Sequence, residues 1–243
     1  MTTAGAVLEA IRALPRAGLS EILNGATPVV LAPHPDDEVI GCGGLLHAAA
    51  RAGSRPIIVH VTDGSGSHPR SRAYPREVLI ALRQHEACSA AEILGVPPGH
   101  VHFMELRDTA APHDGPEFDR AARSLLPIIA ACPKPLIFAP WAFDPHCDHQ
   151  AVSKMARRTA RLLGVRRLSY LVWGWTLPHD QELGPVAVAG WRFPVDCDQK
   201  ACALEAYQSQ ISNLIDDDPT AFRLDSETLS LMLSDDETFL LTP

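Results

Sequence analysis

The sequence lacks several features that define common protein classes. Its six cysteines include no C-x-x-C pair, which favours reduced thiols over a disulfide framework. No apolar run approaches the ~20 residues of a membrane helix, and the best one, residues 125–132, is interrupted by Pro127. The N-terminus has no basic region followed by an apolar stretch, so we expect no secretory signal and a cytoplasmic location.

The chain also lacks an excess of basic residues. It has 21 Lys and Arg against 29 Asp and Glu, a net charge of −8, which disfavours a nucleic-acid partner. Hydrophobic residues make up 46% and charged residues 21%, a globular composition that argues against disorder. A length of 243 residues is common for one α/β domain.

Apolar, strand-like runs alternate with helical segments along most of the chain. The predicted strands cover residues 28–32, 55–62, 100–106, 136–140, 167–175 and 186–194. The predicted helices cover residues 4–14, 19–23, 38–52, 75–94, 116–131, 148–163 and 199–212, with a kink or break at Pro127. This alternation is typical of βαβ units, which build a parallel sheet with helices on both faces. Beyond residue 216 the chain is acidic, and we expect it to be irregular and loosely packed.

Polar residues gather where three predicted strands end, at positions 34–38, 62–64 and 144–149. Ligands of open α/β sheets bind beyond the carboxyl ends of the strands. Asp36, Asp37 and Glu38 are consecutive carboxylates that repel one another, and a bound cation would compensate for this repulsion.

His34, Asp37 and His149 together have the composition of a catalytic zinc site, which leaves coordination positions open for water and substrate. His34 and Asp37 are three residues apart across a strand-to-helix turn, and His149 begins a later helix. Two plainer interpretations stay open. Asp36 and Asp37 are also the acids that a helix N-terminus favours, and His149 alone suits a helix cap.

The motifs resemble those of one enzyme family. Ala-Pro-His-Pro-Asp-Asp-Glu at 32–38, followed by Gly-Cys-Gly-Gly at 41–44, resembles the signature of the PIG-L/LmbE-type zinc-dependent de-N-acetylases. Other motifs follow in the family's order: Thr-Asp-Gly at 62–64, Arg83 and Glu86 in an R-x-x-E helix, His-Cys-Asp-His at 146–149, and Ser-Gln at 209–210. The resemblance spans about residues 27–212, with a helical extension at 1–26 and an acidic tail at 213–243. It implies a single Rossmann-like α/β domain with a mostly parallel sheet.

The resemblance also implies an activity and a set of roles. The protein would be a zinc hydrolase that removes an N-acyl group, normally acetyl, from an amino-sugar conjugate or related small amide. His34, Asp37 and His149 would hold Zn²⁺, with another divalent metal such as Fe²⁺ as the alternative. Asp36 would be the general base, a protonated His146 would stabilise the oxyanion, and Asp148 would orient His146. Arg83 would face the substrate, unless it only forms a surface ion pair with Glu86.

Two other functions stay open at this point. An Fe(II)-dependent oxygenase could use the same donors, although such enzymes usually have a β-barrel scaffold. A non-catalytic Rossmann-like module could bind a sugar or nucleotide near Gly41, Gly43 and Gly44. However, their spacing is not G-x-G-x-x-G, and the preceding acids would repel a pyrophosphate.

Two further features allow more than one interpretation. The polar, basic loop at 64–74 is either a solvated surface loop or a lid over an anionic or sugar-bearing substrate. Trp141, Trp173 and Trp175 lie at predicted strand ends, where we expect core packing, with stacking on a sugar as the alternative.

Overall fold

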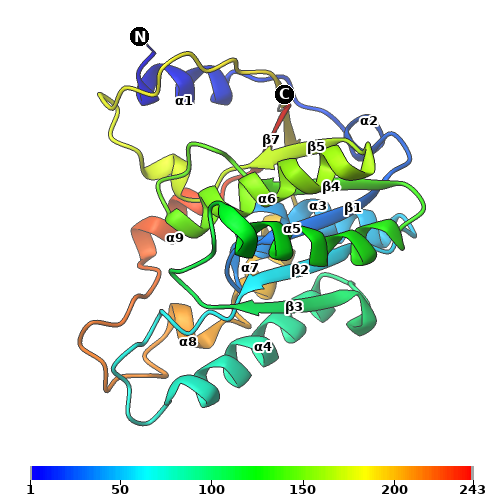
Figure 1. The fold of residues 1–243 in the computed structure, drawn as a ribbon. Helices are drawn as coiled ribbons and strands as arrows, with labels where there is room; N and C mark the ends of the chain where they lie inside the picture. Colours follow the sequence, from blue (N-terminus) through cyan, green and yellow to red (C-terminus); the bar gives the residue numbers. More distant parts are fainter. Residues whose placement is uncertain (1, 242–243) are drawn as a thin grey trace.

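The computed structural model describes residues 2–241 and arranges seven strands in one sheet (Figure 1). The parallel strands are β1 (Thr27–Ala32), β2 (Ile57–Thr62), β3 (Val101–Leu106), β4 (Pro135–Pro140) and β5 (Arg167–Tyr170). The sheet order is β3-β2-β1-β4-β5-β7-β6. The chain therefore extends from β1 toward β2 and β3 on one side and continues with β4 and β5 on the other. This reversal opens a crevice at the carboxyl ends of β1 and β4, where ligands of such sheets bind.

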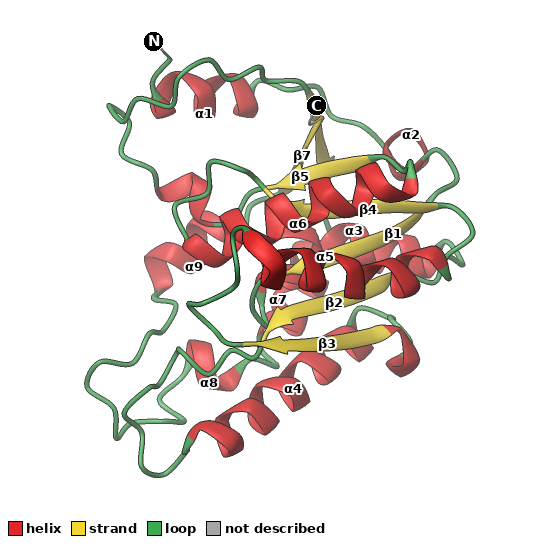
Figure 2. Ribbon diagram, in the orientation of Figure 1, coloured by secondary structure: helices red, strands yellow, loops and turns green. Residues whose placement is uncertain are grey.

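Helices cover both faces of the sheet, as predicted (Figure 2). On one face lie α3 (Asp37–Arg51), α4 (Arg76–Ile93) and α7 (Cys197–Leu204), and on the other lie α5 (Gly115–Ala130) and α6 (Cys147–Leu163). The side chains of β1 divide between these layers, because successive residues of a strand point to opposite faces. Val30 joins the core under α3, whereas Val29 and Leu31 join the core under α5 and α6. The prediction of a Rossmann-like α/β domain is confirmed.

The remaining helices are short. They are α1 (Ala4–Arg12), α2 (Leu19–Leu23), α8 (Gln208–Ile211) and α9 (Ser226–Met232), with 3₁₀ turns at Pro98–His100 and Trp173–Thr176. Within residues 2–241, no helix combines the length and apolar character needed to cross a membrane.

The expectation of an irregular acidic tail is wrong. Residues Asp236–Leu241 form β7, which is antiparallel to both β5 and β6 (Gly190–Pro194) and lies between them. The reason is the apolar content of the strand: Phe239 is fully buried, and its ring lies 5.0 Å from that of Phe138. The acidic run before it obscured this signal.

Several predicted boundaries also differ. The helix predicted at 199–212 is divided into α7 and α8, the strand at 167–175 ends at Tyr170, and the strand at 186–194 is limited to β6. Pro127 does not break α5, because it lies in the last turn of a helix that continues to Ala130.

The glycines at 41–44 lie inside α3 and allow close packing. A Cβ atom at Gly44 would overlap the side chain of Val195. Next to it, Glu237 of β7 accepts hydrogen bonds from the N–H groups of Gly44 and Leu45 at 2.7 and 2.9 Å. Lys200 of α7 pairs with Glu237 at 3.0 Å. These glycines therefore serve contacts within the core, not a phosphate-binding loop.

Gly41 provides a test of this packing. A Cβ atom there would overlap the ring of Tyr170, which is fully buried and donates a hydrogen bond to the carbonyl of Leu31 at 2.8 Å. We expect Gly41→Ala to cost about 1–3 kcal/mol in the free energy of unfolding through overpacking. Denaturant unfolding would measure the loss.

The matched control is Gly99→Ala, because no atom lies within 4 Å of a Cβ built at Gly99. It should leave stability nearly unchanged. Equal midpoints for the two variants would contradict the packing assigned to Gly41.

Candidate active site

The turn between β1 and α3 carries three of the expected site residues. The backbone N–H of His34 donates to Asp37 Oδ2 at 2.9 Å, and the N–H of Asp36 donates to Glu38 Oε2 at 3.1 Å. Asp36 has φ 130° and ψ −30°, a conformation that L-residues rarely adopt. Such a residue costs on the order of 1–3 kcal/mol and persists only where its surroundings hold it.

Arg83 of α4 holds this turn. The residue is 1% exposed, and its guanidinium donates to the carbonyl of Pro35 and to Asp36 Oδ2, the latter at 3.2 Å. Glu86, 3.9 Å from Arg83, is also buried and accepts hydrogen bonds from the N–H and hydroxyl of Ser209. The alternative of a surface ion pair between Arg83 and Glu86 is therefore wrong. A contact between Arg83 and a substrate stays a prediction.

The carboxylate of Asp37 lies between two imidazoles. Its Oδ2 atom is 3.1 Å from His34 Nδ1 and 3.2 Å from His149 Nε2. His149 reaches this point from the first turn of α6, beyond the carboxyl end of β4. The residues predicted as metal ligands thus converge from two separate segments of the chain.

The outward nitrogen of each imidazole faces a further carboxylate. His149 Nδ1 lies 3.3 Å from Asp144, and His34 Nε2 lies 3.1 Å from Asp148 and 3.3 Å from Asp108. Metal-binding histidines commonly make this second contact, which fixes the ring orientation and raises ligand basicity.

Sequence reasoning assigned no role to Asp108 or Asp144. Asp108 follows the last residue of β3 by two positions, and Asp144 opens the polar segment after β4. The strand-end rule had already selected the segment that contains Asp144, whereas Asp108 joins the site through the pairing of β3 beside β2.

The carboxylate of Asp148 contacts a different histidine from the one expected. Its carboxylate accepts hydrogen bonds from the N–H groups of Thr109 and Ala111 and faces His34, not His146. Only its backbone N–H reaches His146, donating to Nδ1 at 3.2 Å. This contact places the proton of a neutral His146 on Nε2.

Neighbouring charges oppose the effect of burial on these groups. Burial alone would lower the pKa of His149, but Asp37 and Asp144 raise it to about 9. Burial would raise the pKa of Asp37, yet the two imidazoles hold it well below its usual range. Burial raises the pKa of Asp36 to about 6, against the opposing charge of Arg83. The cluster is therefore rich in carboxylates, which stabilise a positively charged group bound between them.

The donor set fits a metal ion. Two donors about 2 Å from one tetrahedral ion lie about 3.3 Å apart, close to the separations of Asp37 Oδ2 from His34 and His149. A ring nitrogen from each of His34, His146 and His149 also lies within 4.8 Å of the other two. Among residues 2–241, every cluster of three or more donor residues includes His34 or His146.

Several of these residues line a cavity of about 450 Å³. The polar lining includes His34, Asp36, Asp37, Asp108 and His146. Long loops meet around the carboxyl ends of the strands (Figure 2). Of the basic loop at 64–74, Gly66 and Ser67 line the cavity.

Comparison with known families identifies one whose model covers most of the motif-bearing core. A sequence model of the PIG-L family, described as GlcNAc-PI de-N-acetylase, matches residues 29–160, more than half of the chain. The chain belongs to the PIG-L family. The family resemblance of its motifs is thus confirmed.

Curated relatives of this PIG-L protein include two deacetylases. A diacetylchitobiose deacetylase of Thermococcus kodakarensis is 28% identical over 157 residues, covering 63% of this chain and 53% of the relative. A 1D-myo-inositol 2-acetamido-2-deoxy-alpha-D-glucopyranoside deacetylase of Corynebacterium efficiens is 28% identical over 203 residues, covering 74% and 64%. The chain therefore spans less than two thirds of either relative.

A solved structure shares the fold. The N,N'-diacetylchitobiose deacetylase of Pyrococcus horikoshii superposes with a TM-score of 0.67 at 20% identity, covering 93% of this chain and 87% of that one.

The buried position of Arg83 generates a prediction. We expect Arg83→Met to lower the free energy of unfolding by about 3–5 kcal/mol, because it leaves the buried carboxylate of Asp36 without its partner. Denaturant unfolding would measure the change.

Arg120→Met is the matched control, since Arg120 pairs with Glu117 three residues earlier on an exposed helix face. Such exposed pairs contribute a few tenths of a kcal/mol. Equal losses in the two variants would contradict the role assigned to Arg83.

Proposed function

We propose that this PIG-L protein is a zinc-dependent hydrolase that removes an N-acetyl group from a small amino-sugar conjugate. The observation that carries the proposal is the position of Asp37 Oδ2, within 3.2 Å of ring nitrogens of both His34 and His149. The substrate class is supported by the two curated relatives, both of which are named as deacetylases of acetylated sugar compounds.

His34, Asp37 and His149 would hold the metal, and their two imidazoles and one carboxylate are a composition found in catalytic zinc sites. A bound Zn²⁺ would make water a strong nucleophile at neutral pH and polarise the amide carbonyl. Three carboxylates on the ring nitrogens that face away from the metal would keep the imidazoles oriented. Asp144 contacts His149, and Asp148 and Asp108 contact His34. Fe²⁺ accepts the same donors, and metal analysis of the purified protein distinguishes the two ions.

Asp36 would be the general base. It cannot easily join Asp37 as a ligand, because the turn directs its carboxylate toward Arg83 along the cavity wall. A carboxylate with a pKa raised to about 6 by burial is a better proton acceptor than an ordinary aspartate. Asp36 would take the proton of the attacking water and later supply it to the departing amine.

His146 would stabilise the oxyanion as a neutral donor, not in the protonated form expected from the sequence. Burial and the neighbouring His34 and His149 lower its pKa. Its Nδ1 accepts the N–H of Asp148, so the Nε2–H is the proton available to a developing negative charge.

Zinc binding provides a direct test of the ligand set. We expect Zn²⁺ to raise the thermal midpoint of the metal-free protein, because an ion that binds only the folded state adds about 3 kcal/mol at 100-fold excess over its Kd. Asp37→Ala and His149→Ala should abolish this shift, as measured by calorimetry with metal analysis.

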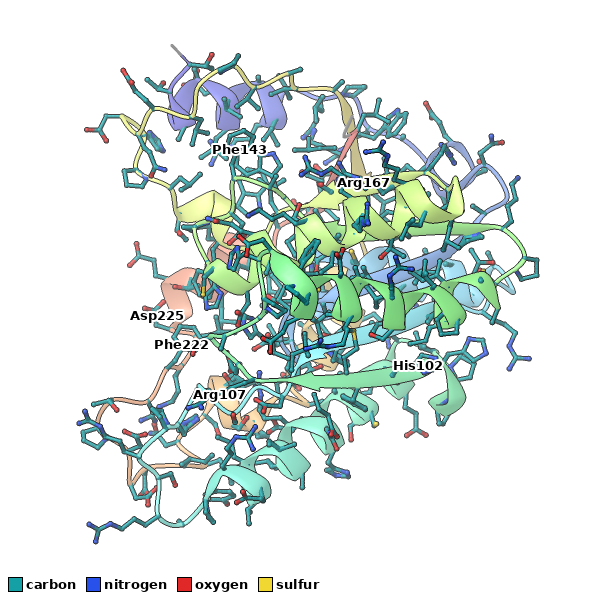
Figure 3. All side chains as sticks on the ribbon, in the orientation of Figure 1. His102, Arg107, Phe143, Arg167, Phe222 and Asp225 are labelled. Atoms are coloured by element: carbon teal, nitrogen blue, oxygen red, sulfur yellow. The ribbon has the colours of Figure 1, made fainter. Side chains whose placement is uncertain are left out.

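His102→Ala is the control, since His102 belongs to β3 and lies away from the carboxyl edge (Figure 3). It should retain the shift. A wild-type midpoint that zinc does not move would reject the metal site.

The second test concerns the base. We expect Asp36→Asn to lower kcat for amine release by about 10²–10⁴-fold, the usual contribution of a general base, while zinc stays bound. Asp119→Asn on the exposed face of α5 should retain full activity. An unchanged rate in Asp36→Asn would reject the assignment of the base.

A further inference from the structure

The cavity has a second, apolar side that the proposed chemistry does not use. Ile40, Trp173, Phe222 and Leu224 line it together with the polar residues. The rings of Trp173 and Phe222 meet edge to face, with centroids 5.6 Å apart. Phe222 is 43% exposed although it faces the cavity, so a large part of its ring is free to contact a ligand.

The backbone around Phe222 is fixed by two segments. Its N–H donates to the carbonyl of Ser67 at 2.8 Å, and the N–H of Leu224 donates to the carbonyl of Gln210 at 2.9 Å. These bonds hold Phe222 against the loop at 64–74 on one side and against α8 on the other.

Two aspartates bind the same loop a few residues earlier. Asp217 accepts hydrogen bonds from the Ser71 hydroxyl and from the N–H groups of Arg72 and Ala73, at 2.6–2.9 Å. Asp218 accepts the N–H of Arg70 at 2.7 Å. The loop at 64–74 is therefore joined to the C-terminal segment, and the two form one wall of the cavity.

We propose that Trp173 and Phe222 bind the apolar face of a second ring, attached to the N-acetylated sugar. This inference rests on the proposed function and names the part of the substrate that is not cleaved. Aromatic side chains in ligand cavities contribute apolar area and a defined contact geometry, beside a few polar groups that fix the orientation of the ligand. In the described part of the chain, neither Trp173 nor Phe222 makes a ring or polar contact with the candidate metal ligands. Replacing either side chain should therefore change the affinity for the substrate and not the rate of the chemical step.

Amine release from N-acetylglucosamine and from its phenyl β-glycoside tests the inference in the zinc-loaded enzyme. We expect Phe222→Ala to raise KM for the phenyl glycoside by about 3- to 10-fold, the range of an aromatic contact. KM for the monosaccharide and kcat for both compounds should be unchanged. Phe222→Tyr, which keeps the ring, should restore the wild-type KM.

Phe143→Ala is the matched control. Phe143 is 36% exposed and packs on Trp141, and Figure 3 shows it on the side of α1, away from Phe222. It should behave as wild type with both compounds, and thermal unfolding would confirm that each variant is folded.

The outcomes separate the two proposals. An active wild type whose KM for the phenyl glycoside is unchanged by Phe222→Ala, or is changed equally by Phe143→Ala, overturns this inference and leaves the hydrolase intact. A zinc-loaded wild type that releases amine from neither compound counts against the proposed function and against this inference with it.

Discussion

The shared contact of Asp37 with two imidazoles constrains the whole carboxyl edge of the sheet. Four aspartates face His34 and His149, so each imidazole has a carboxylate on both of its nitrogens. Four like charges in a buried space are stable together only with compensating cations or hydrogen bonds. The N–H groups of Thr109 and Ala111 on Asp148, and those of His146 and Gly174 on Asp144, provide part of that compensation.

The strained turn at Asp36 depends on residues from two distant segments of the chain. Arg83 of α4 donates a hydrogen bond to the carbonyl of Pro35 in the turn. Tyr207, which precedes α8, donates a hydrogen bond from its hydroxyl to Glu38. Arg83 also lies over the ring of Tyr207, 5.6 Å from its centroid. Burial raises the pKa of Glu38 to about 8, so this group is largely protonated at neutral pH and adds little charge beside Asp36. These contacts hold the backbone of the turn in place around Asp36.

The sequence predicted what local patterns determine. The apolar run of β1 and the residues directly after it locate His34, Asp36 and Asp37, because strand and site are adjacent in the chain. Asp108, in contrast, joins the site through the pairing of β3 beside β2, which no local pattern specifies. The same holds for β7: its place between β5 and β6 depends on where Phe239 finds its partners. The role of Arg83 also required knowledge of burial, since an R-x-x-E helix looks identical on a surface.

The bond of Glu237 to the middle of α3 has a consequence for biosynthesis. α3 begins with Asp37, yet the carboxylate that receives the N–H groups of Gly44 and Leu45 is encoded almost two hundred residues later. Domains generally fold as units in the order of their synthesis, and the nascent chain cannot complete the surroundings of this helix until residues 236–241 have been synthesised. Until then, the first helix after β1 lacks its buried partner.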